Sequence, residues 1–153
     1  MSIEIEQLNT MRVGAVRHVG PYNQIGPKFQ QLGAIAGQAG LFQAPGALMM
    51  GIFHDNPRET PADQLRSDAA IAVAKDTSLP EGLTEQVVPG GRYARFTHIG
   101  SFEGLPGAWT QFADSLGSGA YRMREGPGLE IYRSDMATTP VDQLRTDLYM
   151  PVE

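Results

Sequence analysis

The sequence predicts an α+β fold built from two copies of a strand–helix–strand–strand unit. The main observation is an internal repeat, in which TPADQLRSD (60–68) returns as TPVDQLRTD (139–147) with seven of nine residues identical. A second match joins RVGAVRHVG (12–20) to RYARFTHIG (92–100). One helix per unit would cover one face of its strands. We therefore expect the units to form a pseudo-twofold antiparallel sheet with two main helices and a central groove where they meet.

In the first copy, a β-rich run predicts a strand over 12–19 that ends at Gly20. Apolar residues then recur at steps of three and four from Ile25 to Ala39, as on one face of a helix. Pro27 falls near the start of this helix, where a missing N–H costs least. Further strands of this copy are expected over 47–54 and 68–74.

The second copy repeats this order. A strand over 92–99 is followed by a helix whose apolar residues run from Leu105 to Leu116, with Pro106 near its start. Further strands are expected over 128–133 and 146–152, and an extra strand near 2–8 precedes the first copy. We therefore expect one domain over 1–153, with repeats at about 11–75 and 91–152 and a linker at about 76–90.

Composition excludes several classes of function. The absence of cysteine excludes disulfides and thiolate chemistry, and the net charge of −5 argues against direct nucleic-acid binding. No apolar run is long enough to span a membrane, and the acidic N-terminus lacks the apolar core of a signal peptide. His18, His54 and His98 lack metal-ligand spacing, and no phosphate-binding loop stands out. We expect a cytoplasmic protein without a metal or cofactor.

The repeated TP-DQLR-D element favours a structural interpretation. Thr-Pro starts a turn, and Leu65 and Leu144 follow it where each can enter the core. Arg66 and Arg145 can pair with nearby carboxylates. We therefore interpret this element as part of the fold rather than as a binding motif.

The informative positions are those where the copies differ. Glu130 aligns with Gly51, although the next two residues are similar in both copies, Ile-Phe in the first and Ile-Tyr in the second. Alternation along a strand places Glu130 and Tyr132 on one face and Ile131 on the other. If that face is buried, the carboxylate needs a raised pKa or a cation. The sequence alone leaves open a solvent-facing glutamate on an ordinary strand.

Aromatic residues accompany this position. Trp109 aligns with Phe29 and shares the apolar stripe of its helix with Phe112, which is compatible with both a core position and a groove wall. Tyr22 begins the first helix, where it can line a pocket or staple the helix. The candidate ligand-binding residues are Glu130, Trp109, Tyr132, Tyr22 and Phe112.

The order of these segments resembles the GyrI-like family over nearly the whole chain. The resemblance rests on VRHVGPY, DNPRETPADQLRSD, GGRYARFTHIGSF, AWTQF, LEIYRSD and LYMPV. This family includes a stand-alone DNA gyrase inhibitory protein and the effector-binding domains of AraC-type and MerR-type regulators. The resemblance implies SHS2-type units and a central ligand groove. It also implies a glutamate that contacts cationic aromatic ligands, matched here by Glu130, with Trp109 and Tyr132 at aromatic positions.

Three functions follow from the resemblance. The first is a stand-alone protein that binds lipophilic aromatic or cationic compounds and serves toxin or drug resistance. The second is modulation of DNA gyrase as a protein partner. The alternative is a hydrolase of strained, cyclopropane-containing genotoxins, with Glu130 as general acid or base and Tyr132 assisting. The sequence does not decide between binding and catalysis.

Overall fold

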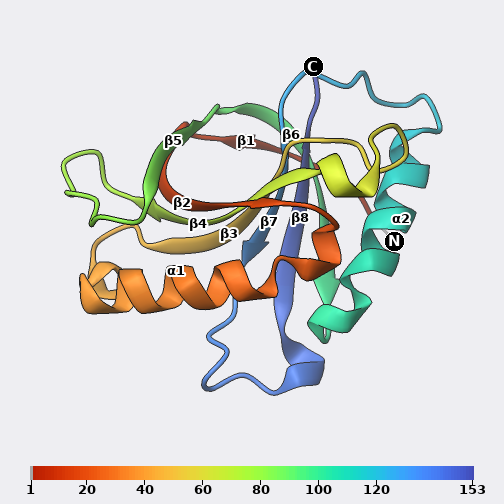
Figure 1. Ribbon diagram of the computed structural model, residues 1–153. Helices are drawn as coiled ribbons and strands as arrows, with labels where there is room; N and C mark the ends of the chain where they lie inside the picture. Colours follow the sequence, from red (N-terminus) through yellow and green to blue (C-terminus); the bar gives the residue numbers. More distant parts are fainter. Residues whose placement is uncertain (1) are drawn as a thin grey trace. The chain divides into compact units, whose positions relative to one another are not determined.

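The computed structural model describes residues 2–153, which form an α+β arrangement of antiparallel strands and two main helices (Figure 1). The chain divides into two compact units. The N-terminal unit is Asn9–Gly90, and the C-terminal unit combines residues up to Leu8 with Gly91–Glu153. The predicted fold class and the duplicated unit are confirmed. Within the described residues, neither helix is long and apolar enough to cross a membrane.

The N-terminal unit has a four-stranded sheet in the order β3-β4-β2-β5. Helix α1 lies across one face of this sheet (Figure 1), where Leu32 and Ala36 pack against Val16 and Ile71. The helix begins with proline in its first turn, and Gly40 follows its end with a φ of 71°. The elements are β2 (Met11–Val19), α1 (Gly26–Gln38), β3 (Leu48–Phe53), β4 (Arg66–Val73) and β5 (Thr84–Val88).

The C-terminal unit repeats this plan with the strand order β1-β6-β8-β7. Helix α2 covers one face of the sheet, and Phe112 and Leu116 pack there against Ala94, Leu148 and Val152. The elements are β1 (Glu4–Leu8), β6 (Gly91–Ile99), α2 (Leu105–Leu116), β7 (Gly128–Tyr132) and β8 (Arg145–Pro151).

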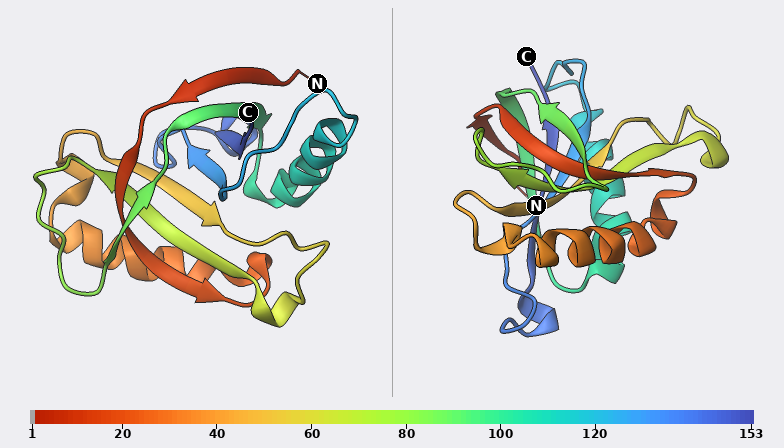
Figure 2. Two further views of the ribbon diagram at one scale, coloured as in Figure 1. Left: turned by 90° about the horizontal axis from the view of Figure 1, so that it is seen from above. Right: turned by 60° about the vertical axis from the view of Figure 1, so that its left-hand side comes forward.

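One outer strand of each unit lies next to the other repeat in the sequence. Strand β1 precedes the first repeat, yet it pairs with β6 of the second, with Leu8 opposite Gly91 (Figure 2). Strand β5 precedes the second repeat and pairs with β2 of the first, with Val88 opposite Met11. The predicted strand near 2–8 is confirmed. Strand β5 lies inside the stretch 76–90 that the sequence suggested as a linker.

The TP-DQLR-D element forms the same turn in both units. A short 3-10 helix, η3 (Ala62–Gln64) or η5 (Val141–Gln143), leads into a buried leucine at 65 or 144. Arg66 then pairs with Asp55 at 2.9 Å, and Arg145 pairs with Asp147 at 3.1 Å. These contacts confirm the structural interpretation of the element.

The last residue of this element is a buried acid, Asp68 or Asp147, on the face opposite the helix. Asp147 accepts hydrogen bonds from Arg133, Arg145 and Thr97. Burial by itself raises the pKa of Asp147, but these hydrogen bonds outweigh burial and lower it. Asp68 follows the same pattern with Arg17 and His54 as donors. Each unit therefore contains a buried, ionised carboxylate on its β4 or β8 strand, and neighbouring basic side chains balance its charge.

Candidate ligand-binding site

Glu130 lies in the middle of β7, on the face that α2 covers. It is opposite Leu148 of β8, whereas Ile131 is opposite Asp147 on the other face. Only 7% of Glu130 is exposed. The predicted alternation is therefore confirmed, and the alternative of a solvent-facing glutamate is wrong.

Both carboxylate oxygens of Glu130 accept a hydrogen bond from an aromatic side chain. The Trp109 indole Nε1–H donates to Oε2 at 2.6 Å, and the Tyr132 hydroxyl donates to Oε1 at 2.7 Å. These are short bonds of the kind that a charged acceptor makes. Tyr132 reaches the carboxylate because residues two apart on a strand share a face, whereas Trp109 comes from α2.

The surroundings of Glu130 favour its protonated form more than water does. Burial raises the pKa of Glu130 above its usual range, and the hydrogen bonds from Tyr132 and Trp109 and the charge of His98 only partly oppose this. Burial and the adjacent carboxylate also hold the pKa of Tyr132 well above its usual range. The Tyr132 hydroxyl therefore keeps its proton and stays a donor. A cation beside Glu130 would stabilise the ionised carboxylate.

Gly128 makes room for Trp109 beside the carboxylate. A Cβ at residue 128 would lie 3.3 Å from Trp109 Cη2 and 3.0 Å from Met150 Sδ. The equivalent residue of the N-terminal unit is Met49, and both Met49 and Phe29, the equivalent of Trp109, pack against the core of that unit. The C-terminal unit thus has the large Trp109 ring on its helix and no side chain at Gly128 of its strand. The N-terminal unit has the smaller Phe29 ring and a methionine at these positions. This exchange of volume accompanies the change from Gly51 to Glu130.

Other aromatic rings support the two donors. Phe102 contacts the Tyr132 ring edge-on at 5.6 Å between centroids, and Phe112 lies 5.8 Å from Trp109. Phe112 is fully buried, so it holds Trp109 from behind and does not form an accessible wall. Phe102 directly follows the HIG turn, as Tyr22 follows HVG, and this repeated position is the sequence feature that points to Phe102.

The structure brings four of the five candidate residues together in the C-terminal unit: Glu130, Trp109, Tyr132 and Phe112. Tyr22 belongs to the N-terminal unit. There its hydroxyl donates to Asp55 O at 2.6 Å, and its ring lies 4.9 Å from Phe53. These contacts hold the start of α1 in place. Of the two roles that the sequence left open for Tyr22, they correspond to the one in which it stabilises the helix start.

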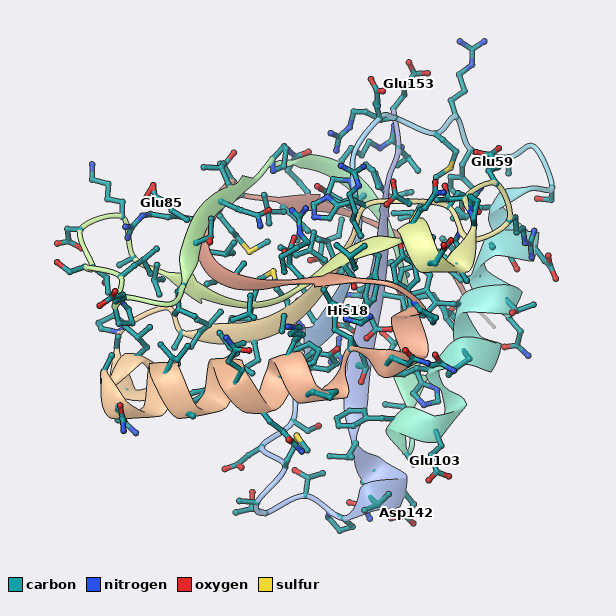
Figure 3. The ribbon with its side chains drawn as sticks, in the orientation of Figure 1. His18, Glu59, Glu85, Glu103, Asp142 and Glu153 are labelled. Carbon is teal, nitrogen blue, oxygen red and sulfur yellow. The ribbon has the colours of Figure 1, made fainter. Side chains whose placement is uncertain are left out.

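Histidines 18 and 98 have matching structural roles. His18, marked in Figure 3 at the end of β2, donates from Nε2 to Pro21 O at 2.9 Å. His98 donates from Nε2 to Ser101 O at the same distance. Each bond closes the turn between a strand and the following helix.

Two hollows in the described surface lie away from Glu130. One, of about 410 Å³, is lined in part by Arg95, Thr97 and Arg145 of the C-terminal unit. The other, of about 600 Å³, lies beside Arg12 and Val87 of the N-terminal unit. Neither is lined by Glu130, Trp109 or Tyr132. The Glu130 carboxylate is instead covered by its own two donors, which a ligand would have to displace.

Comparisons with known proteins agree with this arrangement. The family model described as GyrI-like small molecule binding domain matches residues 1–153. The chain is 31% identical to a DNA gyrase inhibitor from Yersinia enterocolitica, over all of this chain and 98% of the relative. The C-terminal domain of EcmrR has the same fold, with a TM-score of 0.76 and 18% identity over 99% of this chain and 97% of that one.

A further solved structure, SAV2435 bound to tetraphenylphosphonium, matches with a TM-score of 0.69 and 17% identity, over 100% of this chain and 94% of that one. At this identity, the likeness shows the fold alone. The family model and the Yersinia relative cover the whole chain, and the duplicated unit with its helix-covered sheets fits them. The chain therefore belongs to the family of GyrI-like small molecule binding domains.

Proposed function

We propose that this protein binds flat, lipophilic compounds that carry a positive charge. The observation that carries the proposal is the buried Glu130 carboxylate, whose two oxygens are bonded to aromatic side chains and not to an arginine or lysine in the described hydrogen bonds. A cation gains from such a carboxylate and from adjacent aromatic faces together. The solved relative with bound tetraphenylphosphonium supports this class of ligand.

Binding would exchange one set of contacts for another. An incoming cation takes over a carboxylate oxygen from Tyr132 or Trp109, and the released ring becomes a wall of the site. The folded protein already bears the free-energy cost of burying Glu130, which its raised pKa reflects. The ligand therefore meets a carboxylate that has little water to lose. Phe112 supports Trp109 from behind. Tyr22, in the N-terminal unit, stays a separate predicted ligand contact.

The intrinsic fluorescence of Trp109 provides a direct test, because it is the one tryptophan of the chain. Titration with tetraphenylphosphonium at neutral pH is expected to change this fluorescence saturably. The isosteric variant Glu130→Gln should weaken the affinity at least tenfold, because a desolvated charge pair contributes more than about 1.4 kcal/mol. Neutral triphenylphosphine oxide should bind both proteins alike.

The control is Glu103→Gln, an exposed acid of the same unit that extends away from the ribbon in Figure 3. It changes net charge equally but leaves the site intact, so its affinity should equal that of the wild type. Equal affinity of wild type and Glu130→Gln for the cation would contradict the charge role.

In the cell, the proposed role is sequestration of toxic compounds in the cytoplasm. We propose one domain whose repeats span about 11–75 and 91–152, joined by a stretch at about 76–90 that includes strand β5. The relatives named DNA gyrase inhibitor support DNA gyrase as a protein partner. A supercoiling assay with purified gyrase tests this role. Inhibition should appear at stoichiometric protein, and unimpaired supercoiling at a hundredfold excess would remove gyrase from the proposal.

The raised pKa of Glu130 favours a second candidate, hydrolysis of strained cyclopropane-containing electrophiles. Glu130 would accept a proton from the attacking water as the C–O bond forms and one C–C bond of the strained ring breaks. The protonated Glu130 would then return this proton to the released carbon, with the Tyr132 hydroxyl assisting. Loss of many substrate equivalents per protein, abolished in Glu130→Gln, would favour catalysis. Disappearance that stops at one equivalent would favour binding.

A further inference from the structure

We propose that Thr146 is a specificity residue of the Glu130 site, where its hydroxyl forms a hydrogen bond with the ligand. The site would then prefer cationic aromatic compounds that carry an amino or hydroxyl group on the ring system. This inference rests on the proposed binding function. It adds a second polar contact that neither the repeat nor the family description assigns.

Thr146 lies beside the carboxylate on the same sheet face. Strand β8 runs between β7 and β6, and Thr146 is opposite Tyr132 on one side and His98 on the other. The next residue of β8 on this face is Leu148, which is opposite Glu130. Thr146 is therefore diagonal to Glu130, which separates the two positions by roughly 7–8 Å. A fused aromatic ring system spans such a distance.

The Thr146 hydroxyl is buried without a partner. Thr146 is 0% exposed, and its Oγ1 has no hydrogen bond among the described residues. The polar atoms beside it are directed elsewhere, because the Tyr132 hydroxyl donates to Glu130 and His98 Nε2 donates to Ser101 O. A buried hydroxyl without a partner costs free energy, which a valine of the same shape would avoid. A ligand would supply the missing partner.

Displacement of Tyr132 links the two contacts. When a cation replaces the Tyr132 hydroxyl at Glu130 Oε1, the ring that lies directly across from Thr146 is released. The Thr146 hydroxyl then becomes accessible from the space that the ring occupied. One movement would therefore make both the charged and the polar contact available.

The N-terminal unit offers a matched control. Ser67 occupies the equivalent position, and its Oγ is likewise buried without a partner among the described residues. Its cross-strand neighbours are Phe53 and His18, and Gly51 stands where the other unit has Glu130. Ser67 thus provides a buried hydroxyl at the matching position without a carboxylate at the position of Glu130, and removing this hydroxyl should leave ligand binding unchanged.

The experiment compares two cations in the wild type, Thr146→Val and Ser67→Ala. Ethidium carries two aromatic amino groups, whereas tetraphenylphosphonium has no hydrogen-bonding group. In Thr146→Val, the Kd for ethidium should rise about fivefold, the usual net value of one hydrogen bond, while the Kd for tetraphenylphosphonium stays unchanged. Ser67→Ala should match the wild type for both cations.

Thermal unfolding serves as the second measurement, and Thr146→Val should melt no lower than the wild type because it removes an unpaired polar group. An unchanged Kd for ethidium in Thr146→Val, or an equal rise in Kd for both cations, would overturn the role of Thr146 and leave the proposed function standing. If neither cation binds the wild type, the proposed function and this inference fail together.

Discussion

Replacement of Gly128 by alanine should loosen the packing of Trp109 against β7. The added Cβ would lie 3.0 Å from Met150 Sδ and 3.3 Å from Trp109 Cη2, well inside the 3.5–4.0 Å at which carbon atoms pack best. Such overpacking costs about 1–3 kcal/mol, and the lower entropy of the unfolded alanine chain offsets about 0.4–1 kcal/mol of this. We expect Gly128→Ala to lower the free energy of unfolding by about 1–2 kcal/mol.

Urea unfolding followed by circular dichroism measures this change, and Gly107→Ala is the control. Gly107 lies in α2 with no atom within 4 Å of its would-be Cβ, so alanine there should raise stability by about 0.5–1 kcal/mol. The emission of Trp109 should also shift in Gly128→Ala, because its bond to Glu130 is disturbed. Two variants of equal stability, with unchanged emission, would refute the packing argument.

Three further predictions concern charge and hydrogen bonding. The pKa of Glu130 is raised in the folded protein, so ionisation of Glu130 destabilises the fold. The free energy of unfolding of the wild type should therefore fall, relative to that of Glu130→Gln, as pH rises from the usual glutamate range through the raised pKa. Urea titrations at several pH values that show the opposite slope would exclude this. The pKa of Asp147 is lowered, so its stabilisation is present above the usual aspartate range and lost as pH falls. Asp147→Asn should therefore cost about 2–4 kcal/mol at neutral pH, and Asp68→Asn a similar amount; a loss below 1 kcal/mol in chemical denaturation would contradict the buried pairing. Tyr22→Phe should cost about 0.5–1.5 kcal/mol through its bond to Asp55 O, and an unchanged melting temperature would argue against it as an anchor.

Much of the site could be predicted from the sequence because its signals are local or repeated. The comparison of Glu130 with Gly51 showed that the fold itself does not require an acid there, and strand alternation placed Tyr132 on the same face. The helical stripe placed Trp109 toward the sheet. The role of Phe112 behind Trp109 could not be separated from that of an accessible wall, because periodicity gives the face of a residue but not its depth.

The contacts of Glu130 depend on distances that no pattern encodes. Whether the carboxylate meets solvent, an arginine or two aromatic donors depends on how closely α2 approaches β7, and Gly128 permits that approach. Thr146 gave no signal in the sequence, since a threonine in a strand is ordinary. Its importance arises from its neighbours across two strands, Tyr132 and His98.

The sequence by itself determined the repeated unit, the fold class and the one acidic position that breaks the repeat, because these follow from residue identity and short-range periodicity. Only the tertiary structure decided which strands pair. Strand β1 joins β6, and β5 joins β2, so each unit is completed by a strand that lies next to the other repeat in the sequence. Strand pairing joins segments far apart in the chain through backbone hydrogen bonds, which any residue except proline can donate, and residue patterns therefore carry little information about the partner.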